Sequence, residues 1–290
     1  MSPTDQGNRS APARPDPLPL PVVDNHAHLD IRRDDDLASD GLDLAAHVER
    51  LVKDARAVGV DRIVQIGCDI ESAELTAELV DVHPALLGGV ALHPNEAPLH
   101  AERGDLDEAF AVIERLVEHP RIRVVGETGL DYYRTEPEGR GAQQDSFRRH
   151  IDLAKRTGKV LQIHDRDAHD DVLRILAEEG APAKTVMHCF SGDMAMAREC
   201  VERGYYLSFA GTVTFKSARE LRNALSVVPP SQLLVETDTP YLTPTPYRGG
   251  VNAPMLVALT VRTMADVLTM SVADLCRTIS ATSEDVYGPW

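Results

Sequence analysis

The stretch Val22-Val-Asp-Asn-His-Ala-His28 decides the fold class of this chain of 290 residues. It begins with two β-branched residues typical of a strand and ends in a polar group that includes Asp24, His26 and His28. An open, doubly wound sheet is expected to carry a glycine-rich phosphate-binding turn after its first strand. Neither a GxGxxG motif nor a P-loop occurs in the sequence. The first strand therefore favours a different arrangement of parallel strands.

Short β-branched or apolar runs recur along the chain and alternate with amphipathic segments. Eight runs predict strands, at 21–25, 62–68, 86–93, 123–127, 160–164, 185–190, 205–209 and 233–238. The intervening and following segments predict helices, at 41–58, 71–82, 102–118, 141–157, 167–180, 193–203, 216–227, 254–269 and 271–281. Strands that alternate with helices form βαβ units around a parallel sheet. Eight such units predict an α/β protein with a single (β/α)8 TIM-type barrel.

Composition divides the chain into two segments. Residues 1–21 contain six prolines and little apolar content, so we predict a disordered, Pro-rich tail. Residues 22–290 are expected to form the barrel as one domain. No apolar run reaches the roughly 18 residues of a spanning helix, and the N-terminus lacks the apolar region of a secretory signal. We expect no membrane association and no obligate protein partner.

The charge balance and the cysteines limit the class and location of the protein. Asp plus Glu number 46 and Lys plus Arg 30, for a net charge of −16. This balance argues against binding nucleic acid through a broad basic surface, but bound metal ions could supply positive charge locally. The four cysteines, Cys68, Cys189, Cys200 and Cys276, form no CxxC pair. That spacing fits a reducing compartment, and we expect a cytoplasmic location.

Titratable side chains collect where the predicted strands end. The carboxyl ends of the strands build the active site of such a barrel. The side chains found there are Asp24, His26, His28, His93, Glu127, Asp131, His164, His188, Glu236 and Asp238. Residues two apart on a strand point to the same side, so His26 and His28 can bind one ion together.

Four histidines and two carboxylates of this group form a candidate ligand set. A single histidine at a strand end more often has a structural role than a ligand role. Six such residues at the same end of one barrel are not explained by separate structural roles. Imidazole and carboxylate ligands suit zinc, manganese, iron or cobalt, with magnesium where oxygen dominates. Six ligands exceed the need of one hydrolytic ion that keeps a position open for water. Two ions that share one carboxylate are the more economical arrangement.

Eight motifs in a fixed order give a family resemblance. They are Asp24-Asn-His-Ala-His-Leu-Asp30, Ala91-Leu-His-Pro94, Gly126-Glu-Thr-Gly-Leu-Asp-Tyr-Tyr133, Ile163-His-Asp-Arg-Asp-Ala168, Met187-His-Cys-Phe-Ser-Gly192, Ser208-Phe-Ala-Gly-Thr-Val-Thr-Phe215, Val235-Glu-Thr-Asp-Thr-Pro-Tyr-Leu242 and Arg248-Gly-Gly-Val-Asn-Ala-Pro254. Together they resemble the TatD family of metal-dependent deoxyribonucleases, within the metallo-dependent hydrolase superfamily. The motifs around Glu127 and Asp238 are the most specific.

The resemblance implies two divalent cations per subunit, Mg²⁺, Mn²⁺ or Zn²⁺. By this resemblance, His26, His28 and Asp238 are terminal ligands of one ion. Glu127 is the ligand that bridges to the second ion. Asp238 is also a candidate to orient or deprotonate the attacking water, so Glu127 and Asp238 are the predicted catalytic residues.

The resemblance also implies ligands for the second ion, namely His164 and His188. His93 resembles the family histidine that reaches toward substrate phosphate. The chain departs from the family pattern at Asp165, where Thr, Cys or Ser is usual, and at 281–287, where the family usually has an Asn-containing helix with a final Leu-Phe. Neither departure removes a proposed ligand.

The expected reaction is hydrolysis of phosphodiester bonds in DNA, at ends or in single strands. Arg166 and Arg248 are, with His93, candidates for holding phosphate. Tyr132 and Tyr133 either stack on a base or pack against the neighbouring loop.

Two alternatives stay open. One is a related hydrolase that acts on an amide, lactone or phosphotriester. Several such enzymes bridge their metals with a carbamylated lysine on the fourth strand, where this chain has Glu127 and no lysine. The other is an inactive scaffold, which would be expected to lack at least one ligand, whereas all six are present.

Overall fold

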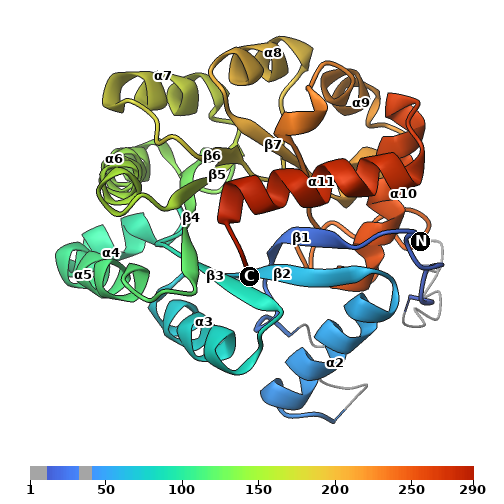
Figure 1. Ribbon diagram of the computed structural model, residues 1–290. Coiled ribbons are helices and arrows are strands. Elements are labelled where there is room, and N and C mark those ends of the chain that lie inside the picture. The colour runs from blue at the N-terminus through green and yellow to red at the C-terminus, as the bar shows by residue number, and fades with distance from the viewer. Residues whose placement is uncertain (1–11, 33–40) are drawn as a thin grey trace, which may run out of the picture.

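Eight parallel strands form one sheet in chain order in a computed structural model that describes residues 12–32 and 41–290 (Figure 1). The strands are β1 Val22–Ala27, β2 Val60–Gly67, β3 Leu86–Val90, β4 Ile122–Asp131, β5 Val160–Arg166, β6 Thr185–Met187, β7 Tyr206–Phe209 and β8 Leu233–Val235. The barrel closes where Ala27 forms a parallel bridge with Thr239, just beyond β8. The predicted barrel is confirmed.

Helices follow the strands and surround the barrel (Figure 1). They are α2 Leu44–Ala57, α3 Ile70–Val82, α4 Ala97–Arg103, α5 Leu106–Val117, α6 Arg140–Thr157, α7 His169–Glu179, α8 Met194–Glu202, α9 Arg219–Leu225, α10 Val257–Leu268 and α11 Val272–Tyr287. Four short 3₁₀ turns complete the described elements: η1 Pro137–Gly139, η2 Gly211–Thr214, η3 Pro230–Gln232 and η4 Pro254–Leu256. The apolar faces of the α-helices cover the outside of the strands, so the main core lies between the barrel and the helices.

Two predicted helices differ from the observed ones. The segment 102–118 is not one helix, because Gly104 adopts a left-handed conformation with φ of 78° and ends α4 before α5 begins. The last helix does not end at residue 281 but continues to Tyr287. Tyr287 is 2% exposed and packs with the residues that fill the barrel interior.

Helix α11 closes the end of the barrel at which the strands begin (Figure 1). Arg62, near the start of β2, donates to Glu284 at 2.8 Å. Lys184, one residue before β6, donates to the Asp285 carboxylate at 2.6 Å. The titratable side chains lie at the opposite end of the barrel, where the strands finish.

Part of the predicted tail packs against the barrel. Leu18 is 7% exposed and belongs to the main core, and its N–H donates to the carbonyl of Val58 at 2.9 Å. Arg262 on α10 donates to the carbonyls of Asp16 and Pro17. The buried Leu18 side chain and these hydrogen bonds therefore fix residues 16–18 against the barrel, although the average composition of the segment is typical of disorder. The rest of the predicted tail, residues 1–11, lies outside the described residues.

No single helix in the described ranges is long and apolar enough to cross a membrane. The segments Pro254–Leu268 and Val272–Tyr287 reach that length and composition only as a pair, with a bend of 110° between them.

Candidate metal centre

The six predicted ligands lie together at the carboxyl ends of the strands. His26 is on β1, Glu127 on β4 and His164 on β5, while His28, His188 and Asp238 follow β1, β6 and β8 within three residues. A local feature allows β4 to approach β5 here. Gly129 has φ of 140°, and a Cβ at this position would lie 2.0 Å from the His164 carbonyl oxygen. Only glycine fits at position 129, where β4 lies directly against the His164 backbone of β5.

His26 and His28 turn the same nitrogen toward the centre. Their Nε2 atoms are 3.1 Å apart. The opposite nitrogen of each ring has a neutral acceptor, since His26 Nδ1 lies 2.8 Å from Gln162 Oε1 and His28 Nδ1 lies 3.0 Å from the Ile66 carbonyl oxygen. An Nδ1–H donated to these oxygens leaves both Nε2 lone pairs free to bind a cation.

Glu127 occupies the middle of the cluster. Its Oε2 lies 2.8 Å from His188 Nε2, 3.5 Å from His164 Nδ1 and 3.7 Å from His26 Nε2. Its Oε1 lies 3.3 Å from His93 Nε2. Burial opposes ionisation, but the surrounding imidazoles, His188 and His93 above all, outweigh it and hold the pKa of Glu127 well below its usual value. An ionised carboxylate therefore faces histidines on several sides.

Asp238 faces the two histidines of the first strand. Its Oδ1 lies 3.5 Å from His28 Nε2 and 3.7 Å from His26 Nε2. The backbone of Asp238 is in the left-handed region, with φ of 56°. Buried Asp24 holds this turn, because it accepts the N–H and the hydroxyl of Thr237 at 2.9 and 2.6 Å. Such strained conformations persist where surrounding contacts enforce them, often at functional sites.

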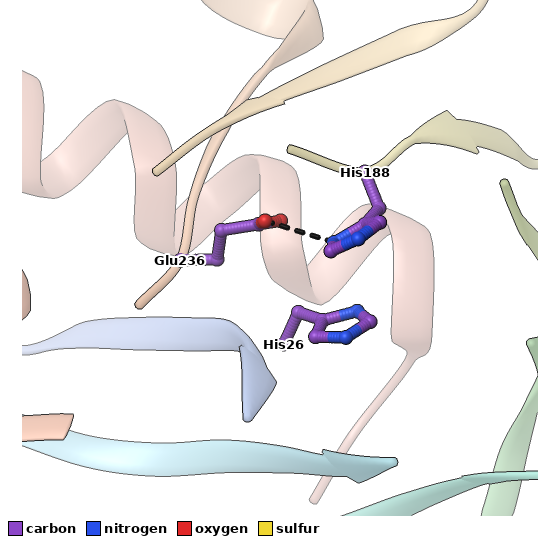
Figure 2. Close-up of side chains that lie close together, drawn as sticks. All are labelled: His26, His188 and Glu236. Atoms are coloured by element: carbon purple, nitrogen blue, oxygen red, sulfur yellow. Dashed lines mark ion pairs between the residues drawn. The ribbon is translucent and has the colours of Figure 1, made fainter. Parts of the chain in front are cut away.

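The other two histidines have carboxylates at their outer nitrogens. His188 Nδ1 lies 2.9 Å from Glu236 Oε1, and His164 Nε2 lies 3.4 Å from Asp131 Oδ2. Figure 2 shows the Glu236 carboxylate directed at His188, with the His26 ring beside it. Burial alone would lower the pKa of both histidines, but the neighbouring carboxylates outweigh it. For His188, Glu236 and then Glu127 raise the pKa well above the usual value, and for His164 the nearby carboxylates of Asp131 and Glu127 raise the pKa to about 9.

The residues present fit a metal ion. Three groups of side chains bring possible ligand atoms within 4.8 Å of one another: His26–His28–Glu127, His93–Glu127–His164 and His26–His188–Glu236. Glu127 Oε2 and His164 Nε2 are buried and lie near charged partners, but none of these contacts within the described ranges has the geometry of a hydrogen bond. Buried polar atoms without partners are costly unless a cation or water binds them.

Histidine 93 has a different environment from the other rings. Its Nδ1 accepts the N–H of Asn95 at 3.0 Å, so a neutral ring carries its proton on Nε2, toward Glu127. Burial lowers the pKa of His93 to about 3. The ring is therefore neutral and acts as a hydrogen-bond donor at the centre.

Exposed cationic side chains stack on aromatic rings elsewhere. The Arg166 guanidinium lies 3.9 Å from the ring centre of Tyr133, and that of Arg248 lies 4.3 Å from the ring centre of Phe215. Tyr133 is 64% exposed. Tyr132 is instead held by its hydroxyl, which donates to Asp171 at 2.7 Å. Of the two tyrosines, Tyr133 has the free face, and Tyr132 packs against the neighbouring elements.

Sequence reasoning missed three contributors to the centre. Gln162 gave no signal, because a lone glutamine inside a strand has no pattern. Glu236 was placed at the strand ends that build the active site, but it was given no role among the six ligands. Cys68 was not assigned to the site, yet its Sγ lies 3.5 Å from Glu127 Oε1 and 3.8 Å from His28 Nδ1. Its position at the end of the second predicted strand was the available signal.

Comparisons with known proteins identify the family of this chain. The family model described as TatD related DNase matches residues 23–288. A protein of Mycobacterium tuberculosis, described as an uncharacterized metal-dependent hydrolase TatD, is 43% identical over 274 residues, which cover 92% of this chain and 98% of that protein. The uncharacterized metal-dependent hydrolase YabD of Bacillus subtilis is 35% identical, with coverage of 88% and 94%.

Solved structures share the fold. The crystal structure of YjjV, a TatD homolog from Escherichia coli, superposes with a TM-score of 0.83 at 22% identity and covers 93% of this chain and 98% of that one. An organophosphorus hydrolase from Deinococcus radiodurans superposes with a TM-score of 0.64 at 15% identity, with coverage of 94% and 93%. The family match over nearly the whole barrel, the relatives and the cluster of histidines and carboxylates lead to one conclusion. The chain belongs to the TatD family of metal-dependent hydrolases.

Proposed function

We propose that this protein hydrolyses phosphodiester bonds in DNA, at ends or in single strands, with two divalent cations on either side of Glu127. The observation that carries the proposal is the place of Glu127. Its two carboxylate oxygens face rings from four different strand ends, at 2.8 to 3.7 Å. The description of the matching family as TatD related DNase supports DNA as the substrate.

Each half of the centre has its own nitrogen ligands. His26 and His28, with Asp238, would hold the first cation, His164 and His188 would hold the second, and Glu127 would be shared. Divalent cations there supply Lewis-acid polarisation of a phosphoryl oxygen and a water acidic enough to attack at neutral pH. Mg²⁺, Mn²⁺ and Zn²⁺ all accept this mixed set of nitrogen and oxygen ligands.

Two side chains act directly on the reacting groups. The Asp238 side chain is 15% exposed, so it can meet solvent, and its carboxylate orients the attacking water and accepts its proton. His93 presents an Nε2–H, because its Nδ1 is occupied by Asn95. This N–H donates to a phosphoryl oxygen and stabilises the charge that develops there.

Aromatic and cationic side chains bind the strand. Arg166 on Tyr133 and Arg248 on Phe215 each combine a charge for phosphate with a ring for a base. Tyr241 is 45% exposed, and its ring centre lies 6.3 Å from that of His28. Stacking accepts any base, so we expect little sequence specificity and, with a net charge of −16, modest affinity.

The cytoplasmic location stays a prediction, drawn from the cysteine spacing. All four cysteines are free in the structure, in agreement with a reducing compartment. Fractionation of the source cells with an antibody to this chain would check it.

The test is hydrolysis of end-labelled single-stranded DNA by metal-stripped protein refilled with Mg²⁺, Mn²⁺ or Zn²⁺. Glu127→Ala and Asp238→Asn variants run alongside, with Tyr132→Phe as an active control. Cleavage that needs metal and disappears in both site variants supports the proposal. Tight metal binding without cleavage under any metal contradicts it, and small amides, lactones and phosphotriesters become the substrates to assay. Strand β4 contains Glu127 and no lysine, which argues against a carbamylated-lysine bridge.

A further inference from the structure

The four ring ligands are supported by acceptors of different charge. On the first strand, His26 has the neutral amide oxygen of Gln162 at 2.8 Å, and His28 has the neutral carbonyl oxygen of Ile66 at 3.0 Å. A hydrogen bond at the outer nitrogen fixes the tautomer and the direction of the ring. A neutral acceptor does so without adding charge to the ligand.

The group beside Nδ1 of His188 is a buried carboxylate. Glu236 is 0% exposed, and its Oε1 lies 2.9 Å from His188 Nδ1 (Figure 2). His188 Nδ1 and both carboxylate oxygens of Glu236 are buried and have no hydrogen-bond partner in the part of the chain that the structure describes, so the 2.9 Å approach is an ion-pair contact. No Lys or Arg of that part forms an ion pair with Glu236 either. A buried carboxylate without a cation is costly, so its pairing with one imidazole requires an explanation.

Glu236 does not share an ion with Glu127 on this geometry. Its oxygen approaches Nδ1 of His188, whereas Glu127 approaches Nε2 of the same ring at 2.8 Å. The two ring nitrogens point in different directions, so one ion cannot be bound by both carboxylates through His188. Glu236 therefore acts on the centre through the ring.

We propose that Glu236 is a positioning residue that accepts Nδ1–H of His188, directs the Nε2 lone pair toward Glu127, and makes this half of the centre bind its cation more tightly than the half formed by His26 and His28. The proposal rests on the ligand roles of the proposed function. A carboxylate acceptor increases the electron density of the imidazole, which strengthens the bond from Nε2 to a metal. The neutral amide oxygen of Gln162 fixes the orientation of the His26 ring but adds no negative charge to it.

The first experiment is a calorimetric titration of the metal-stripped protein with Zn²⁺, without DNA. The wild type is expected to bind two ions with different affinities. Glu236→Gln keeps the shape and removes the charge, so we expect about a tenfold to hundredfold weaker tight site and an unchanged weak site. The matched control is Asp24→Asn, the same exchange at another fully buried carboxylate of this rim, which bonds to Thr237 and to no ring. It should leave the tight site unchanged, and any effect should fall on the half that contains Asp238, whose turn Asp24 holds.

A second measurement uses the wild type and so does not depend on folding of the variant. Long-range ¹⁵N–¹H correlations of the Zn²⁺-loaded protein, assigned with His188→Gln, report which ring nitrogen carries the proton. A protonated Nδ1 with Zn²⁺ on Nε2 supports the proposal, and Zn²⁺ on Nδ1 overturns it. Equal Zn²⁺ affinities in the wild type and Glu236→Gln also overturn it, whatever the DNA assay shows. Two Zn²⁺ sites with the expected loss, but no cleavage of DNA, would overturn the nuclease activity and leave the role of Glu236 intact.

Discussion

Gln162 Nε2 donates to the hydroxyl of Tyr287 at 3.2 Å, inside the barrel. The same amide group donates to the carbonyl of Asn25 at 3.0 Å and presents its oxygen to His26. The last helix thus reaches the candidate metal centre from the opposite end of the barrel. This contact gives a structural reason for a tyrosine near the end of the chain.

Tyr287→Phe should destabilise the protein by about 1–2 kcal/mol, because one buried N–H of Gln162 loses its acceptor. Zn²⁺ binding should change little, since Asn25 still holds the amide in place. Urea unfolding and calorimetry of the same preparation measure both quantities. Unchanged stability would show that the hydroxyl contact contributes nothing.

The exposed ring of Tyr133 should support substrate binding. Tyr133→Ala removes a stacking face worth about 1–3 kcal/mol per base and the platform of Arg166. We expect KM for single-stranded DNA to rise about tenfold or more while kcat stays nearly constant. Tyr132→Phe is the matched control, because it loses only the hydroxyl bond to Asp171. A similar KM for all three proteins would exclude Tyr133 from the substrate path.

His150 should make stability fall with acidity. Its Nδ1 lies 2.7 Å from the Ser146 carbonyl oxygen, and its Nε2 accepts the N–H of Leu92 at 3.2 Å. Burial lowers its pKa from 6.5 to about 4. Between these values the unfolded chain binds a proton and the folded chain does not, so its contribution is complete above pH 6.5 and falls by about 3 kcal/mol toward pH 4.

His150→Gln removes this titration. Urea unfolding of both proteins at pH 7 and pH 4.5 would measure it, and the variant should lose less stability on acidification than the wild type. The same loss in both proteins would assign the acid sensitivity to other groups.

Divalent cations should stabilise the fold. Free cation at about 100 times its Kd adds about 2.7 kcal/mol to a protein that binds it only when folded. For a chain of this size that corresponds to about 4–5 °C in Tm. A thermal scan with Mn²⁺ or EDTA would show the shift in the wild type and much less of it in Glu127→Ala. An equal shift in both would place the stabilising ion elsewhere.

The strand-end histidines could be predicted because the active site of such a barrel lies at the carboxyl ends of its strands, and the sequence alone shows which residues end a strand. His26, His164 and His188 each end an apolar run, and parallel strands bring those ends to one rim. Their meeting is found in the structure, while their roles as ligands stay predictions. The helix boundary at Gly104 was harder, since an apolar stripe begins at Leu106 and conceals a break just before it.

The supporting contacts could not be predicted, because they join residues far apart in the chain. Gln162 and His26 are separated by 136 positions, and only closure of the barrel brings them to 2.8 Å. The choice between Glu236 and Asp238 as a ligand depends on side-chain direction after β8. The family resemblance selected Asp238 as the predicted ligand, whereas the left-handed backbone at this residue, with φ of 56°, is not visible in the motif.

The bridging place of Glu127 is tested most directly by electron paramagnetic resonance of the metal-stripped protein loaded with two equivalents of Mn²⁺. Two Mn²⁺ ions joined by one carboxylate are magnetically coupled, so we predict a multiline coupled spectrum in the wild type. In Glu127→Gln the coupling should be lost or the second ion should not bind. A wild-type spectrum of isolated, uncoupled Mn²⁺ at full loading would contradict a centre built around Glu127.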